Sequence, residues 1–192
     1  MDYSDLRAML QPFVAKGWPA PSALAANTSY DIVGLTSTNP PVPVTVQQLE
    51  AALAAQLPGA PISAMLSAVP AELTQIANQF TSQIEISGLT LETGPSDGGG
   101  FAIRSFAISL DPAAHTAQLS GLTIEDYGLQ LNFAPVGTVL VWNPILFATA
   151  QFLGVTCGLQ VGLLDPSITL ALSEGAHGTI DTILGSTSSG TS

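Results

Sequence analysis

The fold is decided by residues 83–110, which read QIEISGLTLETGPSDGGGFAIRSFAISL. Apolar and polar side chains alternate on both sides of a glycine-rich centre, the pattern of two half-buried β-strands. The three glycines at 98–100 suit a loose connection, so the stretch predicts an antiparallel hairpin. Within the second strand, Phe106 is out of phase with Ile103, and this slip at Ser105 predicts a β-bulge.

Period-two alternation continues beyond this hairpin. Further segments with this pattern are 122–125, 129–133, 155–163 and 168–172. We expect a second hairpin whose turn lies at residues 126–128. The run 139–142 has no polar face, which indicates a central strand or one covered on both sides. Together these segments predict an antiparallel meander or a sandwich-like sheet.

The first 81 residues have helical spacing between proline-rich connectors. Apolar residues recur at helical intervals over 6–13, where Pro12 should end the helix near Gln11. Thr45 and Gln48 form a capping-box pattern that opens a helix. Proline at position 70 suits the first turn of another helix. These signals predict a helical layer ahead of the strands.

We therefore predict an α+β fold in which a helical, proline-rich N-terminal layer (about 1–81) packs on an antiparallel sheet (about 82–175). Residues 1–184 are expected to form a single domain, with a subdivision near residue 82 as the alternative. Residues 185–192 read GSTSSGTS, the composition of a flexible tail or linker.

Charge is scarce and mostly negative. The 192 residues include three Lys and Arg against 14 Asp and Glu, a net charge of −11 at pH 7. A typical soluble chain has about a quarter charged residues. We expect no nucleic-acid partner, because phosphate contacts need clusters of Lys and Arg. The longest apolar stretch, 145–164, is interrupted by Gly, Gln and Thr, so we expect no membrane span. The N-terminus lacks a signal-peptide pattern, which favours a cytoplasmic chain or a part of a larger assembly.

Four carboxylates are the metal-ligand candidates. Glu92 and Asp97 flank the glycine-rich connection, and Glu125 and Asp126 are adjacent at the expected second turn. Carboxylate oxygens are the ligands that Ca²⁺ prefers, although no EF-hand spacing is present. Calcium is thus a candidate, and no organic cofactor is expected.

The chain offers little for nucleophilic or redox chemistry. His115 and His177 are the two imidazoles, and a serine triad would need a Gly-x-Ser-x-Gly elbow that the sequence lacks. We expect both histidines at surface or turn positions. Cys157 is the single cysteine, so no internal disulfide can form, and its apolar neighbours predict a buried thiol.

Three functions remain open from the sequence. The first is a non-catalytic structural or interaction module that self-assembles or docks on a partner protein through an apolar, low-charge surface, because monomers usually stay soluble through charged surfaces. The second is a carrier of an apolar small molecule or lipid in a cavity between sheet and helices. The third is a carboxylate-based hydrolase, which no motif supports, so an enzyme is the less favoured reading.

Overall fold

A computed structural model describes residues 1–33, 42–54, 62–69, 71–112, 116–119, 122–137, 139–152, 155–163 and 168–172. The predicted α+β fold with an antiparallel sheet is confirmed. His115, His177 and the expected tail at 185–192 lie outside the described residues, so the predictions made for them stay predictions.

The described strands belong to one nine-stranded sheet. They are β1 (Ser29–Val33), β2 (Val42–Thr45), β3 (Gln83–Pro95), β4 (Phe101–Pro112), β5 (Thr116–Leu119), β6 (Leu122–Val136), β7 (Val139–Phe152), β8 (Val155–Gly162) and β9 (Ile168–Leu172). The strand order is β1-β3-β4-β6-β7-β8-β9, while β2 pairs with β3 and β5 pairs with β6. Every one of these pairings is antiparallel.

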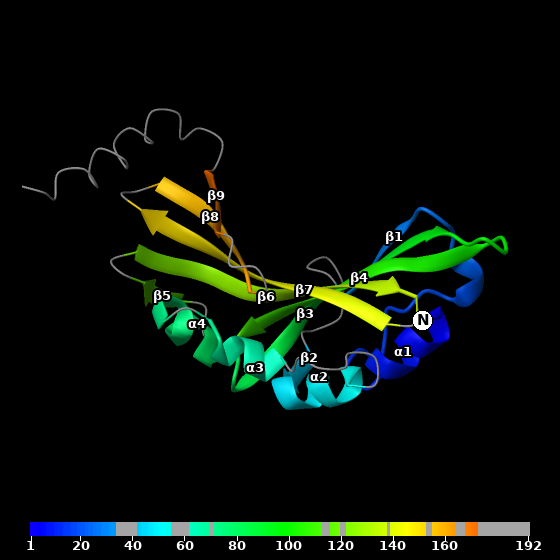
Figure 1. Ribbon diagram of the computed structural model, residues 1–192, viewed down its shortest axis with the longest axis horizontal. Helices are drawn as coiled ribbons and strands as arrows, with labels where there is room; N and C mark the ends of the chain where they lie inside the picture. The colour runs from blue at the N-terminus through cyan, green and yellow to red at the C-terminus, as the bar shows by residue number, and fades with distance from the viewer. Residues whose placement is uncertain are drawn as a thin grey trace, which may run out of the picture.

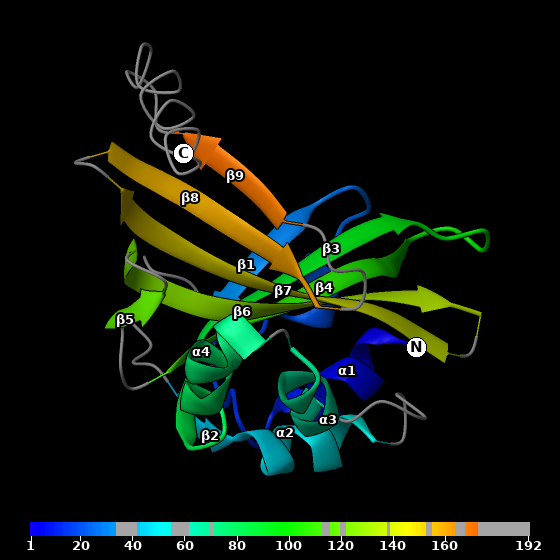
Figure 2. The same cartoon turned by 60° about the vertical axis from the view of Figure 1, so that its left-hand side comes forward.

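The helices cover one side of this sheet. They are α1 (Tyr3–Leu10), α2 (Val46–Leu53), α3 (Ile62–Ser67) and α4 (Thr74–Gln79), with single 3₁₀ turns at Pro21–Ala23 and Ala71–Leu73. Figures 1 and 2 show all four helices on the same side, with the ends of the sheet at β1 and at β8–β9 curving away from them. Besides the helices, the N-terminal segment supplies β1 and β2, both of which pair with β3.

Local capping explains where two of the helices begin. The Asp2 carboxylate accepts a hydrogen bond from the third backbone N–H of α1. At α2 the predicted capping box is present: the backbone N–H of Gln48 donates to the Thr45 hydroxyl (3.2 Å), and that of Thr45 donates to the Gln48 side chain (2.9 Å). The Glu50 carboxylate of α2 accepts from the backbone N–H of Ser63 (2.5 Å), which ties α3 to α2.

The core lies between the helices and the inner face of the sheet. Alternate residues of β3, β4 and β6 point inward and are buried: Ile84, Ile86, Leu89, Leu91, Phe106, Ile108, Leu110, Leu129, Leu131 and Phe133. The rings of Phe106 and Phe133 stack at 4.6 Å between centroids, and Trp142 continues the stack. Cys157 is buried, as predicted.

The β4 bulge confirms the predicted phase slip. Glu92 of β3 pairs with Ser105, and Thr93 pairs with Ile103, so Arg104 is the extra residue. This extra residue lets the buried face pass from the odd-numbered to the even-numbered positions of β4 without breaking the strand.

The expected second hairpin is wrong. β6 continues through residues 126–128, and its partner strand β7 pairs with Glu125 and then with Tyr127. Asp126 is the extra residue of a bulge and has φ of +56°, a left-handed conformation that aspartate tolerates better than most residues. A bulge and a tight turn both interrupt the alternation, and the sequence pattern alone does not separate them.

Candidate functional site

The side of the sheet opposite the helices is called the open face here. In the described part of the chain, no helix lies over it (Figures 1 and 2). The register aligns one row of its residues across four strands, since Thr90 pairs with Ala107, Ala107 with Asn132, and Asn132 with Asn143. The open face is therefore a continuous surface whose side chains come from strands far apart in the sequence.

Small and uncharged polar side chains dominate the centre of this face. On β4, β6 and β7 the outward residues are Ser105, Ala107, Ser109, Gln130, Asn132, Ala134, Val141, Asn143, Ile145 and Phe147. The exposed large hydrophobic residues among the described ones are Val136 (57% exposed) and Val141 (53%). The surface is thus richer in hydroxyls and amides, and poorer in large apolar side chains, than the sequence hypothesis of an apolar docking surface implied.

A groove of about 430 Å³ lies in the middle of the open face. Residues that line it include Thr90 and Glu92 of β3, Ser105 and Ala107 of β4, and Gln130 and Asn132 of β6; Val141 and Asn143 of β7 extend it. Its size falls within the range of ligand pockets, about 300–1,000 Å³. The groove is on the outer side of the sheet, whereas the carrier hypothesis expected a cavity between sheet and helices.

Hydrogen bonds hold the polar side chains of the groove in place. The Ser105 hydroxyl donates to one carboxylate oxygen of Glu92 at 2.8 Å. On the opposite wall, the Gln130 amide nitrogen donates to the Asn132 side-chain oxygen (3.0 Å), and the Asn132 amide nitrogen donates to the backbone carbonyl of Asn143 (3.3 Å). These bonds orient the side chains before any ligand arrives.

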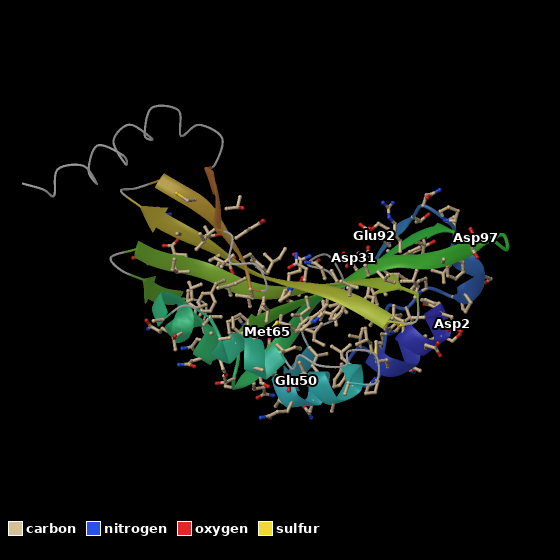
Figure 3. All side chains as sticks on the ribbon, viewed as in Figure 1. Asp2, Asp31, Glu50, Met65, Glu92 and Asp97 are labelled. Carbon is tan, nitrogen blue, oxygen red and sulfur yellow. The ribbon has the colours of Figure 1, made fainter. Side chains whose placement is uncertain are left out.

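The open face is acidic at its margins. Its carboxylates are Asp31, Glu85, Glu92, Asp111 and Glu125, each at an outward position of its strand. Arg104, at the β4 bulge, is the cation among the described residues of this face, and its side chain lies along Gly94. Figure 3 shows Asp31 and Glu92 on the side of the sheet away from the helices, and Asp97 at the tip of the β3–β4 hairpin.

The four calcium candidates do not form one group. Glu92 and Asp97 belong to the β3–β4 hairpin, while Glu125 and Asp126 lie at the bulge of β6. Glu92 pairs with Ser105, and the next residue, Phe106, pairs with Phe133 of β6, so Phe133 marks the level of Glu92 on that strand. Glu125 is eight residues from Phe133, which is about 27 Å along the strand. Across the described residues, no three His, Cys, Asp or Glu side chains gather closely enough to hold a metal ion. Calcium binding at either pair stays a prediction.

Sequence reasoning missed the amides of the groove. The sequence pattern identified Gln130 and Asn132 only as polar residues of an alternating strand, and it gave no prediction for Asn143. The one available signal was the residue type of Asn132 and Asn143, since Asn is depleted in strands whereas Thr is enriched.

A second feature lies in the core. The Tyr127 side chain is 1% exposed, and its hydroxyl is the buried side-chain polar atom that finds no hydrogen-bond partner in the described residues. Its ring meets that of Phe80 edge-on at 6.2 Å. Burial raises the pKa of this hydroxyl above its usual 10.0.

Comparisons with protein families, with curated proteins and with solved structures gave no match for this chain. Among the helices that the structure describes, none has the length and apolar character to cross a membrane.

Proposed function

We propose that this chain is a non-catalytic interaction module that docks on protein through the open face of its sheet. The observation that carries the proposal is the groove, which combines a pocket-sized volume with pre-oriented amides and a nearly uncharged floor. Uncharged polar groups cost less to desolvate than ions, so such a face can be covered by a partner at a modest penalty.

The apolar side chains of the face support the same conclusion. Val141 is exposed at the groove, and Ile145 and Phe147 are half-buried on the same strand. Interfaces commonly place apolar contacts at the centre with hydrogen-bonding groups around them. The carrier and hydrolase hypotheses have no comparable feature among the described residues.

Site-specific photo-crosslinking in the cells that naturally make the chain tests this proposal. A benzoylphenylalanine replaces Val141 in the groove, and the matched control places it at Gln75, which is exposed on α4 on the helix side. We expect protein adducts at Val141 and few at Gln75. Equal adducts at both positions, or none at Val141 in a variant with native circular dichroism, would refute the open face as the docking surface.

A further inference from the structure

The groove joins an acceptor-only carboxylate to a wall of amides. Within the described residues, one oxygen of Glu92 accepts no hydrogen bond, and a carboxylate has no donor, so a ligand at this position must supply donors. The amides of Gln130, Asn132 and Asn143 each keep N–H groups that donate to no described residue, so the amide wall offers both donors and acceptors. The guanidinium of arginine has five N–H donors and no acceptor, which makes it the complement of the carboxylate.

Charge points to the same group. Glu92 is the one ionised residue among those that line the groove, and Ser105 holds its carboxylate in place. Asp31 lies on the neighbouring strand, where it pairs with Thr90, and adds a second negative charge beside the β3 wall. Since guanidinium and carboxylate form short, charge-assisted hydrogen bonds, this wall favours a cation over a neutral side chain.

The same charges disfavour a second copy of this chain as the occupant. Each copy has a net charge of −11, and five carboxylates against Arg104 stand on the open face. Bringing two such faces together would juxtapose like charges, which opposes association. A partner of opposite charge gains from the same field.

The shape of the groove fits an extended segment. Glu92 on β3 and Asn132 on β6 lie two strands apart, about 10 Å, and two residues apart along the strands, about 7 Å, so they are about 12 Å from each other, with Ser105 and Ala107 of β4 between them. An extended chain of three to four residues covers about that distance. Asparagine and glutamine amides present the same donor and acceptor groups as a peptide unit, so they can pair with a partner's backbone.

We infer that the groove binds an extended, arginine-bearing segment of a partner protein, with the guanidinium at Glu92 and the segment's backbone at the amide wall of Gln130, Asn132 and Asn143. The inference rests on the proposed docking function and names the chemistry of the partner.

A titration of the full chain, followed by backbone amide shifts in NMR, tests this inference. The probe is the blocked pentapeptide acetyl-Ala-Thr-Arg-Thr-Ala-amide, and its matched control has citrulline, the neutral isostere, in place of arginine. We expect saturable shifts confined to the groove strands, with binding of the citrulline peptide about tenfold weaker because the charge is lost.

A pair of variants with the same charge change completes the test. Glu92→Gln should weaken binding of the arginine peptide about fivefold or more, whereas Asp97→Asn, at the exposed hairpin tip, should leave it within about twofold. Equal affinity for the two peptides, an unaltered affinity in Glu92→Gln, or shifts outside the groove would overturn the inference.

The two proposals fail in distinguishable ways. Heteromeric adducts at Val141 without arginine-peptide binding would keep the docking function and overturn the arginine inference. Adducts between two copies of the chain would do the same, because a second copy would then occupy the open face. Absence of adducts overturns the docking function itself.

Discussion

Replacing Tyr127 with phenylalanine should stabilise the protein. The tyrosine side chain is 1% exposed and its hydroxyl has no partner in the described residues. Burying an unpaired hydroxyl costs about 1–3 kcal/mol. Removing the oxygen leaves a small cavity, which lowers the gain in stability by a few tenths of a kcal/mol. Tyr127→Phe should therefore raise the free energy of unfolding by about 1–2 kcal/mol, which is roughly 2–8 °C in Tm for a chain of this size.

The matched control is the same chemical change at Tyr3. That side chain is 5% exposed, but its hydroxyl donates to the backbone carbonyl of Pro19 at 2.6 Å. Tyr3→Phe removes this bond and should lower stability by about 1 kcal/mol. Urea unfolding followed by circular dichroism measures both, with an unchanged m-value as the sign that the unfolded states are comparable. Loss of stability in Tyr127→Phe would show that the hydroxyl is paired and would refute the reasoning.

A pH dependence follows from the same residue. Burial raises the pKa of the Tyr127 hydroxyl in the folded state, while in the unfolded chain it ionises near 10. The unfolded state therefore releases this proton first, and the wild type loses stability as pH rises above about 10. Tyr127→Phe lacks this loss, so its advantage over the wild type should be larger at about pH 11 than at about pH 9. An advantage that shrinks at high pH would contradict the assignment.

Two further substitutions probe the sheet and a helix cap. A Cβ at Gly128 would lie 2.9 Å from both Phe147 Cε2 and Asp111 Oδ1. Gly128→Ala should therefore lower the free energy of unfolding by about 1–3 kcal/mol. Adding Phe147→Leu should recover part of this loss, as measured by urea unfolding. Thr45→Ala removes the side-chain cap of α2 and should cost about 1 kcal/mol, whereas Thr45→Ser should retain most of the stability; equal losses in the two variants would argue against the capping role.

Features set by neighbours in sequence were the predictable ones. The capping box at Thr45 needs residues three apart, and the β4 bulge is visible as a phase slip within ten residues. The alternation of 155–163 and 168–172 predicted β8 and β9 for the same reason. Each of these signals depends on side-chain direction along a single segment, which the sequence states directly.

Features that depend on pairing were missed. Asp126 sits in a bulge rather than a turn because the fourteen-residue β7 pairs along β6 on both sides of it, and that partner is not visible from residues 122–133. Likewise β1 and β2 add to the edge of β3 across more than 35 residues of sequence. Local patterns specify a strand, but its neighbour is chosen by packing of the whole sheet.

The groove also depends on strand pairing. Its lining comes from four strands, so it exists only once the order β3-β4-β6-β7 and the register are fixed. In the sequence, Ser105 and Ala107 belong to one alternating segment and Asn132 to another; in the sheet all three line the same groove. No treatment of one segment at a time could have assembled them.

The scarcity of charge has a different meaning in the structure than it had in the sequence. From the low charge, the sequence predicted an apolar surface that a partner would cover. In the structure, hydroxyl and amide groups line much of the open face, and Val136 and Val141 are its exposed large apolar side chains. Amides retain solubility without the desolvation penalty of ions, and they bind by paired hydrogen bonds whose geometry is selective. Among the residues that line the groove, Glu92 is the carboxylate, and Asp31 lies on the neighbouring strand, so the β3 wall of the groove has the negative charge that a cationic partner group would meet.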